Sequence, residues 1–377
     1  MSQLTVEPVS GRRDLRAFVR FPWKVYRGDP NWVPPLISQM MRTLDPARNP
    51  FFQRADVALF LARRGRRVVG TIAAFVDRWL VDVTGERVGG FGFFEVVEDY
   101  DVAARMLDVA AGWLREHGAE AMRGPLNFNN NDRPGVLIEG ADCPPVMLEA
   151  HTPPYYAAFL ERYGMEKYQD LYAYRAFREQ IGERMENLPP ELGRVAEAAR
   201  RQGVTTRPVR LERWDEEVRT LHRLFNASLT YLPYRLPIPE QTFRRMADEL
   251  RPFVDPRMAV FAEVEGEPVG FCVALPDVNR VLIHLNGRLF PFNWLRLRRL
   301  IRRVDVATFK LMGILPNYRR RGIDALLYLE VVKGFLAGGY RWLDGSVTSE
   351  YNLIVNLVAQ RLGAERYKHF RVYQMPL

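Results

Sequence analysis

The sequence contains little of what a metal centre or a disulfide-stabilised domain needs. Only two cysteines, Cys143 and Cys272, and five histidines occur among its 377 residues. The cysteines lie far apart in the sequence, and no CxxC or HExxH spacing is present. Because zinc sites are built from closely spaced ligands, we expect no metal site. Unpaired thiols are typical of proteins from a reducing compartment.

Long apolar stretches are also absent. Uncharged apolar runs such as Val68–Val76 are far shorter than the roughly 20 residues that span a bilayer. The stretch from Met1 to Pro8 lacks the basic region and the apolar core of a secretory signal. We therefore expect a cytoplasmic protein, and we leave open a peripheral contact with the inner face of the membrane.

Positive charge is in excess. Lysine and arginine number 54 against 45 aspartates and glutamates, so the net charge is +9 at pH 7. This excess favours an anionic partner: a phosphorylated co-substrate, an acidic membrane surface or a nucleic acid. No nucleic-acid recognition motif accompanies the arginines, so nucleic-acid binding is the least favoured of the three.

Two short stretches recur about 200 residues apart. The stretch Val69–Asp77 resembles Val269–Asp277, and Gly164–Tyr174 resembles Gly363–Tyr373. Their order and spacing agree, which indicates two copies of one domain. The length suits this, since single domains usually contain about 100–200 residues.

We expect the copies to be residues 1–179 and 180–377, joined around Gln180–Val204. Both copies mix apolar alternation with helical periodicity. In the second copy, the patterns predict helices at Trp214–Leu229, Glu240–Leu250, Gly322–Leu336 and Asn352–Arg361, and strands at Met258–Glu265, Pro268–Leu275, Val306–Leu315, Arg341–Val347 and Arg366–Gln374. In the first copy, they predict strands at Val57–Ala62, Val68–Val76 and Lys167–Arg175, and helices at Val102–Glu116 and Tyr155–Arg162. Antiparallel hairpins with one strand-to-helix crossover per copy indicate an α/β fold with a mixed sheet.

Three arginines and a glycine separate two apolar runs at Arg319-Arg320-Arg321-Gly322. The first run predicts a strand that ends near Pro316, and the second predicts a helix. The first turn of a helix leaves backbone N–H groups without partners and carries partial positive charge. Glycine lets the backbone approach a bulky anion, and arginine adds forked donors. The stretch is therefore either a cradle for a pyrophosphate or a solvated basic turn.

The segment Leu311–Leu327 resembles the coenzyme A (CoA) signature of the GNAT acyltransferase superfamily. That signature is an apolar strand, a Pro-x-x-Arg/Gln-x-x-Gly-x-Gly/Ala turn and a helix, and Pro316, Arg319 and Gly322 occupy its positions. The whole chain resembles tandem-GNAT proteins, some of which resemble bacterial ceramide synthases that use long acyl-CoA donors. The resemblance implies two tandem GNAT-like domains that use acetyl-CoA or a longer acyl-CoA as co-substrate. It implies that CoA is bound by Met312, Ile314, Arg319, Arg320, Arg321, Gly322, Ile323 and Ala325.

In GNAT folds the acyl-CoA lies in a gap where two neighbouring strands splay apart. The resemblance places this gap between Val269–Leu275 and Ala307–Leu315, with the pantetheine amides paired to the backbone at Met312 and Ile314. A strand N–H near Ile314 would stabilise the oxyanion that forms when an amine attacks the thioester, a contribution of about 3 kcal/mol. Transfer would be direct, without a cysteine nucleophile.

The attacking amine must lose a proton, so a base is required. The candidates are Glu350 beside Asn352, and Asp277; each is also explained as a helix cap or a solvated carboxylate. Two positions depart from the GNAT pattern. Asp324 replaces the final Gly/Ala of the signature, where an ionised carboxylate would weaken pyrophosphate binding. Ala359 occupies the position where many GNAT enzymes have a tyrosine that acts as general acid.

The matching turn of the first copy, Phe93–Asp101, has the opposite charge. It contains four carboxylates and neither arginine nor glycine. Negative charge at the start of a helix would repel a pyrophosphate. We therefore expect the first copy to lack a CoA phosphate-binding turn and to act as a structural or acceptor-shaping half.

A basic segment, Asn279–Arg303, separates the two strands expected to splay. Aromatic residues precede a stretch in which apolar residues fall on one helical face and arginines fall largely elsewhere. Residues 288–303 either contact an anionic membrane or fold over their own domain.

These observations favour an acyl-CoA-dependent N-acyltransferase that passes an acyl group directly to an amine. Two alternatives stay open. One is an enzyme like a ceramide synthase, which uses long-chain acyl-CoA at a membrane surface. The other is a CoA-binding module without catalysis.

Overall fold

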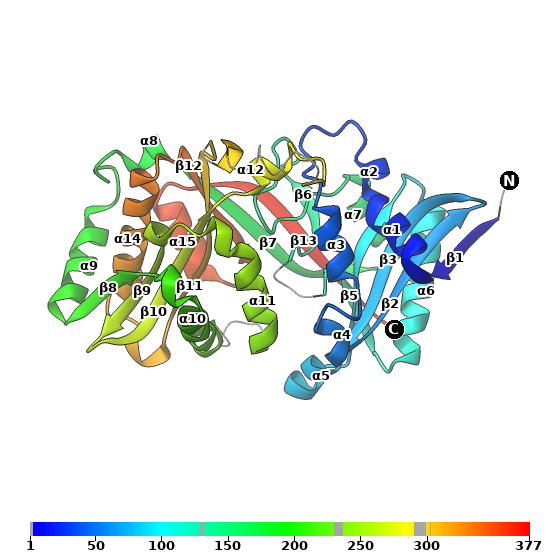
Figure 1. The fold of residues 1–377 in the computed structure, drawn as a ribbon, viewed down its shortest axis with the longest axis horizontal. Helices are drawn as coiled ribbons and strands as arrows, with labels where there is room; N and C mark the ends of the chain where they lie inside the picture. Colours follow the sequence, from blue (N-terminus) through cyan, green and yellow to red (C-terminus); the bar gives the residue numbers. More distant parts are fainter. Residues whose placement is uncertain (1–2, 129–131, 230–236, 290–298, 302) are drawn as a thin grey trace. The chain divides into compact units, whose positions relative to one another are not determined.

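The computed structural model describes residues 3–128, 132–229, 237–289, 299–301 and 303–377 (Figure 1). Two compact units make up the chain, and each is assembled from separate segments of the sequence. Unit 1 consists of Met1–Leu171, Val281–Arg298 and Lys368–Leu377; unit 2 consists of Tyr172–Arg280 and Arg299–Tyr367.

Unit 1 contains a mixed sheet in the order β1-β2-β3-β4-β5-β13, with β6 also paired to β13. Its strands are β1 (Leu4–Pro8), β2 (Ala55–Arg64), β3 (Arg67–Asp77), β4 (Val88–Val96), β5 (Ala121–Gly124), β6 (Val136–Glu139), and parts of β7 (Glu166–Phe177) and β13 (Glu365–Pro376). Its helices are α1 (Gly11–Arg20), α2 (Pro22–Val25), α3 (Ile37–Thr43), α4 (Phe51–Arg54), α5 (Arg78–Thr84), α6 (Tyr100–Glu116) and α7 (Tyr155–Arg162); α12 (Asn279–Leu282) begins in unit 2 and ends in unit 1. All neighbouring strands pair antiparallel except β4 and β5, which are parallel.

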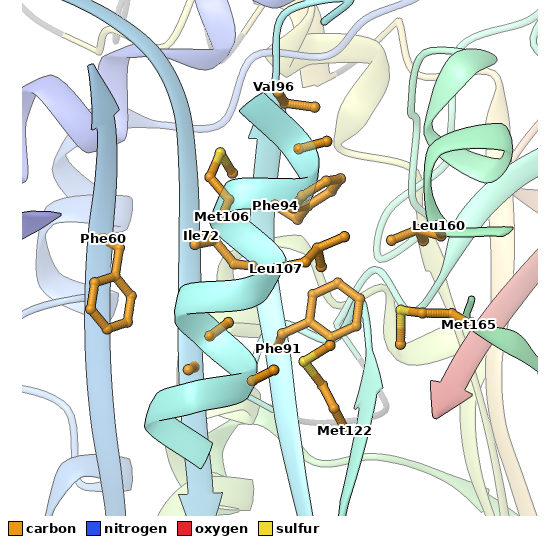
Figure 2. Close-up of a cluster of buried hydrophobic side chains, with 14 of the residues drawn as sticks. Phe60, Ile72, Phe91, Phe94, Val96, Met106, Leu107, Met122, Leu160 and Met165 are labelled. Carbon is orange, nitrogen blue, oxygen red and sulfur yellow. The ribbon is translucent and has the colours of Figure 1, made fainter. Parts of the chain in front are cut away.

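The core of unit 1 lies between α6 and this sheet. The buried residues of α6 are Val102, Ala103, Met106, Leu107, Ala110, Ala111 and Leu114. Their spacing of three and four residues makes one continuous apolar face. Figure 2 shows Met106 and Leu107 among Ile72, Phe91 and Phe94 of the strands.

Unit 2 repeats the plan in the order β7-β12-β11-β10-β9-β8. Its further strands are β8 (Val204–Pro208), β9 (Ala259–Val264), β10 (Glu267–Pro276), β11 (Val306–Ile314) and β12 (Trp342–Ser349). Its helices are α8 (Arg178–Ile181), α9 (Pro190–Arg201), α10 (Trp214–Leu229), α11 (Glu240–Leu250), α14 (Ile323–Ala337) and α15 (Leu353–Arg361), with short 3-10 helices η1 (Leu211–Arg213), η2 (Arg251–Phe253), η3 (Pro256–Met258) and η4 (Pro316–Tyr318). One core cluster contains α9 and α14, and another contains α10 and α11.

The tandem repeat expected from the sequence is confirmed. Val69–Asp77 falls in β3 and Val269–Asp277 falls in β10 with its following turn; both strands form hairpins with the strand before them. The turn between β9 and β10 has φ of +53° at Glu265 and +82° at Gly266, as a tight two-residue hairpin turn requires. Helices α7, α10 and α11 have the predicted bounds. The boundary between residues 179 and 180 stays a prediction.

Two expectations need correction. Strands β10 and β11 do not splay, because they pair antiparallel from Gly270–Ile314 to Pro276–Ala307. The stretch Gln180–Val204 is more than a connection, since it contains α9, which packs against α14 in the core of unit 2.

The part of β13 in unit 1 is fastened by a buried carboxylate on β7. Arg371 donates to Asp170 Oδ1 from Nε at 2.8 Å and to Oδ2 from Nη2 at 3.1 Å, and His369 Nε2 lies 3.2 Å from Oδ2. Burial alone would raise the pKa of Asp170, but the hydrogen bonds from Arg371 and His369 outweigh it and hold this pKa below its usual value. The ionised carboxylate therefore stabilises unit 1.

Replacing Asp170 by asparagine should weaken this attachment. We expect Asp170→Asn to lower the free energy of unfolding of unit 1 by about 3 kcal/mol at pH 7, since it removes the buried carboxylate that accepts two hydrogen bonds from Arg371. Urea unfolding, and faster hydrogen exchange of the β5 amides that face β13, would measure the loss. The pKa of Asp170 is lower in the folded protein than in the unfolded chain, so its ionised carboxylate contributes its full stability only above the unfolded pKa. The difference in stability between the variant and wild type should therefore shrink below about pH 4.

Glu365→Gln is the control, because it removes a half-exposed ion pair with Arg175. It should change stability by less than about 1 kcal/mol. Equal losses from both variants would contradict the role of Asp170.

Candidate functional site

The basic turn between β11 and α14 leaves a helix start open. After β11 the chain passes through η4, then Arg320 at φ +61° and Gly322 at φ +76°, and α14 begins at Ile323. Gly322 is the N-cap residue, and no side chain caps the helix. The first-turn amides of α14 have no partners within the helix, and the helix dipole adds partial positive charge there. This geometry suits an anion.

The three arginines of the turn have different surroundings. Arg319 is half-buried and donates to two carbonyls, Ser228 O at 2.8 Å and Ile314 O at 3.4 Å. It therefore ties the turn to α10 and to the end of β11. Arg320 and Arg321 are exposed, with Arg321 over the Tyr318 ring at 5.1 Å. Two of the three guanidinium groups are thus at the surface beside the open helix start.

Asp324 does not fill this corner. It lies in the first turn of α14, its side chain is exposed, and it does not cap the helix. Ile323 and Ala325, which were expected at the site, have buried side chains and contribute only backbone groups there. The carboxylate of Asp324, which in the sequence was the main argument against an anion site, is therefore exposed to solvent.

The corresponding corner of unit 1 is closed. Helix α6 begins after Asp99, whose carboxylate accepts a hydrogen bond from Val102 N at 3.4 Å. The same carboxylate lies 2.8 Å from Arg64 Nη2. One helix start is thus occupied by a carboxylate and the other is left open by a glycine. The charge inversion seen in the sequence corresponds to two different caps.

A fork lies between β11 and β12 in unit 2. Among the residues that the structure describes, these parallel strands pair from Val306–Trp342 to Phe309–Gly345, and no described residue of β11 beyond Lys310 pairs with β12. Beyond this point β11 continues to Ile314 along β10, and β12 continues to Ser349. The edge of β11 that includes Met312 and Ile314 is thus without a strand partner on the β12 side. The splayed pair is β11 and β12, one strand further along the sheet than the sequence suggested.

A β-bulge interrupts β11 at the apex of the fork. The register with β10 shifts so that Val273 faces Leu311 while Ala274 faces Phe309, which leaves Lys310 as the extra residue. Bulges redirect side chains and are frequent beside active sites. Lys310 is thus directed by the bulge at the position where the two strands part.

Lys310 belongs to a buried polar cluster that the sequence reasoning missed. Its Nζ lies 3.6 Å from Asp344 Oδ2, with side-chain exposures of 8% and 0%. Asp344 also accepts from Thr308 Oγ1 at 2.5 Å and from Tyr367 Oη at 2.9 Å. A signal was present in the sequence, because a lysine and an aspartate interrupt runs that otherwise read as buried strands.

Two of the three residues considered as catalytic, Glu350 and Asn352, are not brought together with this cluster. Glu350 lies half-buried in the turn after β12, and Asn352 starts α15. Ser349, beside Glu350, is five residues beyond Asp344 on β12, about 17 Å in an extended strand. Asp277 is fully buried; it accepts from Asn279 N at 3.1 Å and pairs with Arg280 Nε at 3.1 Å. Asp277 therefore stabilises the turn after β10.

The first copy has a fork of its own. Strands β4 and β5 pair only from Val88–Ala121 to Gly90–Arg123. Glu95, further along β4, accepts from Tyr156 Oη at 2.8 Å. Burial raises the pKa of Glu95 to about 7. Hydrogen bonds from Tyr156 and Tyr26 and the charge of Arg133 lower this pKa in part, so the buried surroundings of Glu95 are two tyrosines and one arginine.

Residues 281–289 of the basic segment pack within unit 1. Asn286 Oδ1 accepts from Trp23 Nε1 at 2.6 Å, and Gly287 O accepts from Ile37 N at 3.0 Å. Residues 290–298 and 302 lie outside the described chain, so the expected membrane contact of residues 288–303 stays a prediction.

Within the described ranges, no three His, Cys, Asp or Glu side chains gather closely enough to hold a metal ion. Among the helices that the structure describes, none has the length and apolar character needed to cross a bilayer.

Comparison with known structures supports the architecture. A tandem GNAT protein from the clavulanic acid biosynthesis pathway superposes with a TM-score of 0.60 at 13% identity, over 99% of this chain and 98% of its own. A GCN5-related N-acetyltransferase from Sphaerobacter thermophilus gives a TM-score of 0.52 at 13% identity, over 99% and 95%. At these identities the likeness establishes the fold alone.

Comparison with curated sequences establishes the family. No protein-family profile matches the chain. The protein named bacterial ceramide synthase of Caulobacter vibrioides (strain NA1000 / CB15N) is 33% identical over 390 aligned residues, covering 100% of this chain and 98% of that protein. Protein YghO of Escherichia coli (strain K12) is 33% identical over 369 residues, covering 96% and 93%. These matches show that the chain belongs to one family with both relatives, and within that family it has the tandem GNAT fold.

Proposed function

We propose that the protein is an acyl-CoA-dependent N-acyltransferase whose single CoA site lies in unit 2. The observation that carries the proposal is the contrast between two helix starts. That of α14 is uncapped and flanked by Arg320 and Arg321, whereas that of α6 is capped by Asp99. An anion is stabilised at the first and repelled at the second.

The CoA pyrophosphate would be held by exposed arginines and backbone amides. Arg320 and Arg321 supply charge, and the amides of Gly322, Ile323 and Ala325 supply neutral donors. Arg319 contributes by fixing the turn, since its guanidinium already donates to two carbonyls. The pantetheine arm would run along the edge of β11 at Met312 and Ile314, which β12 leaves without a strand partner.

Transfer would be direct. A neutral amine attacks the thioester carbon, and a backbone N–H on the open edge of β11 stabilises the oxyanion. Glu350 and Asn352, where β12 ends, are the proposed groups for accepting the amine proton, which a chain of water molecules would carry to them along the fork. Asp277 is the weaker candidate, because its carboxylate is already paired with Arg280.

A long-chain donor is the second candidate, and α15 favours it. None of the side chains of α15 is buried, and Leu353 and Ile354 are 68% and 73% exposed. Exposed apolar surface on this scale marks a binding site. The helix follows β12 at the wide end of the fork, so a fatty acyl chain could cover it at about 0.8 kcal/mol per buried CH₂. The name of the Caulobacter relative points the same way, since a ceramide joins a fatty acyl group to a sphingoid amine.

The third reading is a CoA-binding module without catalysis. It predicts tight binding of acyl-CoA and no turnover across varied amines. We propose a cytoplasmic location for all three readings, and the long-chain reading adds contact with an anionic membrane surface.

Reversing one exposed charge tests the CoA site. We expect Arg321→Glu to weaken acyl-CoA binding at least tenfold, because a charge-assisted contact worth about 1.5–3 kcal/mol becomes a repulsion. Isothermal titration calorimetry would measure it. Arg213→Glu is the control with the same charge change. Arg213 lies just before the start of α10, whereas the basic turn contacts the end of α10 at Ser228, about 24 Å away for a helix of this length. This variant should bind acyl-CoA with the affinity of wild type. Unchanged affinity for Arg321→Glu would remove the assigned site.

A pair of glycines tests the shape of the turn. Gly322 and Gly363 both have φ +76°, so alanine is equally strained at each. A Cβ at Gly322 would lie 2.6 Å from Val195 O, whereas one at Gly363 meets nothing within 4 Å. We expect Gly363→Ala to lose about 1 kcal/mol of stability from the backbone strain alone, and Gly322→Ala to lose more because the turn must also move away from Val195; only Gly322→Ala should lose CoA affinity as well. Similar affinities in the two variants would show that the turn is not the binding element.

The role of α15 is tested with two donors. If it holds the acyl chain, wild type should prefer palmitoyl-CoA to acetyl-CoA in kcat/KM. Leu353→Ser with Ile354→Ser should reduce that preference about tenfold or more, since each lost apolar contact is worth about 1 kcal/mol. Val83→Ser alters a comparably exposed apolar residue of unit 1 and should leave the preference intact. Equal use of both donors by wild type, with no effect of anionic vesicles, would exclude the long-chain reading.

A further inference from the structure

The cluster of Lys310 and Asp344 has no part in the mechanism described so far. It lies at the apex of the fork in unit 2. Burying an ion pair requires both groups to be stripped of water, and apolar residues of similar size often stabilise a protein as well or better. A purely structural role is therefore a weak explanation for an ion pair at this position.

The bulge changes the direction of side chains at the point where the cluster forms. Ala307, Phe309, Met312 and Ile314 all pack in the core cluster that contains α14. Without a bulge, residues 309 and 311 would point the same way, yet Leu311 packs in the cluster that contains α10. The alternation of side chains between the two faces of the sheet is interrupted at Lys310. Its side chain therefore does not have to point to the face that an unbroken strand would give it.

The distance from the basic turn to Lys310 suits the donor. Pro316 is six residues beyond Lys310, about 20 Å along an extended strand. This is comparable to the reach of an extended pantetheine arm. With the pyrophosphate on the α14 start and the arm on the edge of β11, the thioester would arrive at the apex of the fork.

We propose that Lys310 is a catalytic residue whose ammonium group stabilises the negative charge on the departing CoA sulfur, and that Asp344 is the positioning residue that aims it. This deepens the proposed N-acyltransferase function and rests on it. The amine nitrogen forms a bond to the carbonyl carbon, the C–S bond breaks, and its electron pair goes to sulfur. The proton lost by the nitrogen passes to water, and CoA leaves as a thiolate. Lys310 would thereby take the place of the tyrosine that is absent at Ala359.

The cluster holds the lysine for this task. Asp344 Oδ2 lies 3.6 Å from Nζ, and this ion pair fixes the direction of the lysine side chain. Thr308 and Tyr367 donate to the two oxygens of Asp344 and fix its orientation. Preorganised charge of this kind is effective because it needs no rearrangement as the reaction proceeds.

Three variants separate catalysis from structure. We expect Lys310→Met to lower kcat by about 100-fold, with acyl-CoA affinity by calorimetry within about threefold of wild type. Lys310→Arg keeps the charge and should lose less than about tenfold. Lys310→Met combined with Asp344→Asn removes both charges, so no unpaired carboxylate stays buried; its melting temperature should recover while kcat stays low. Recovery of kcat in the double variant would show a structural role and overturn the proposal.

The acidity of the leaving thiol gives a second measurement. We would compare two acyl donors that both lack the nucleotide, an N-acetylcysteamine thioester and a thiophenol thioester. An aryl thiolate is stable without help, so the Lys310→Met defect in kcat/KM should fall from about 100-fold with the first donor to below about threefold with the second. A defect of the same size with both donors would overturn the assigned role.

Wild type in the same assays distinguishes this inference from the proposed function. If wild type binds acyl-CoA but turns over none of the amines tested, the N-acyltransferase function fails and the role of Lys310 with it. If wild type turns over and Lys310→Met does so equally well, only the role of Lys310 fails.

Discussion

The proposed site depends on the separation of two parallel strands. Because β11 and β12 stop pairing at Phe309 and Gly345, one edge of β11 is left with backbone groups that need partners. An amide-bearing arm can satisfy them. The same separation creates an apex, where the chain places a bulge and a buried lysine. Without the fork, the basic turn at the start of α14 would be a surface anion site with nothing leading to it.

The two copies show how one fold serves two purposes. Both have a hairpin, a parallel strand pair that parts early and a helix between the two strands. In unit 1 a carboxylate satisfies the helix start and an arginine neutralises it. In unit 2 a glycine leaves the start open. A few side chains at one corner thus decide which copy can hold an anionic donor, while the scaffold is shared.

Much of the architecture could be predicted from the sequence, for reasons that particular segments make clear. The apolar spacing of α6 and the two-residue turn at Glu265-Gly266 are local signals, so they identify a helix and a hairpin without knowledge of the rest. Which strands part is not a local property. Both β10 and β11 read as apolar strands, and only the register with β12 shows that the gap lies on the other side of β11.

The candidate site was predictable to a similar extent. The arginine-glycine turn could be identified because its signature is contiguous. The different roles of its arginines could not, since Arg319 is held by Ser228, 91 positions earlier. The Lys310–Asp344 pair was missed because its members are 34 positions apart and neither belongs to a motif. Only the paired strands bring them together.

The exchange of segments between the two units affects how the protein is made. Unit 1 includes residues 368–377, whose partners on β5 precede them by about 250 positions. A ribosome therefore releases β1 to β5 long before the strand that completes their sheet exists. In the interval the free edge of β5 is open to wrong pairings, and such long-range pairing forms slowly. The sheet of unit 1 can be completed only after all of unit 2 has been synthesised. The two units therefore cannot finish folding one after the other during translation, as two independent domains could.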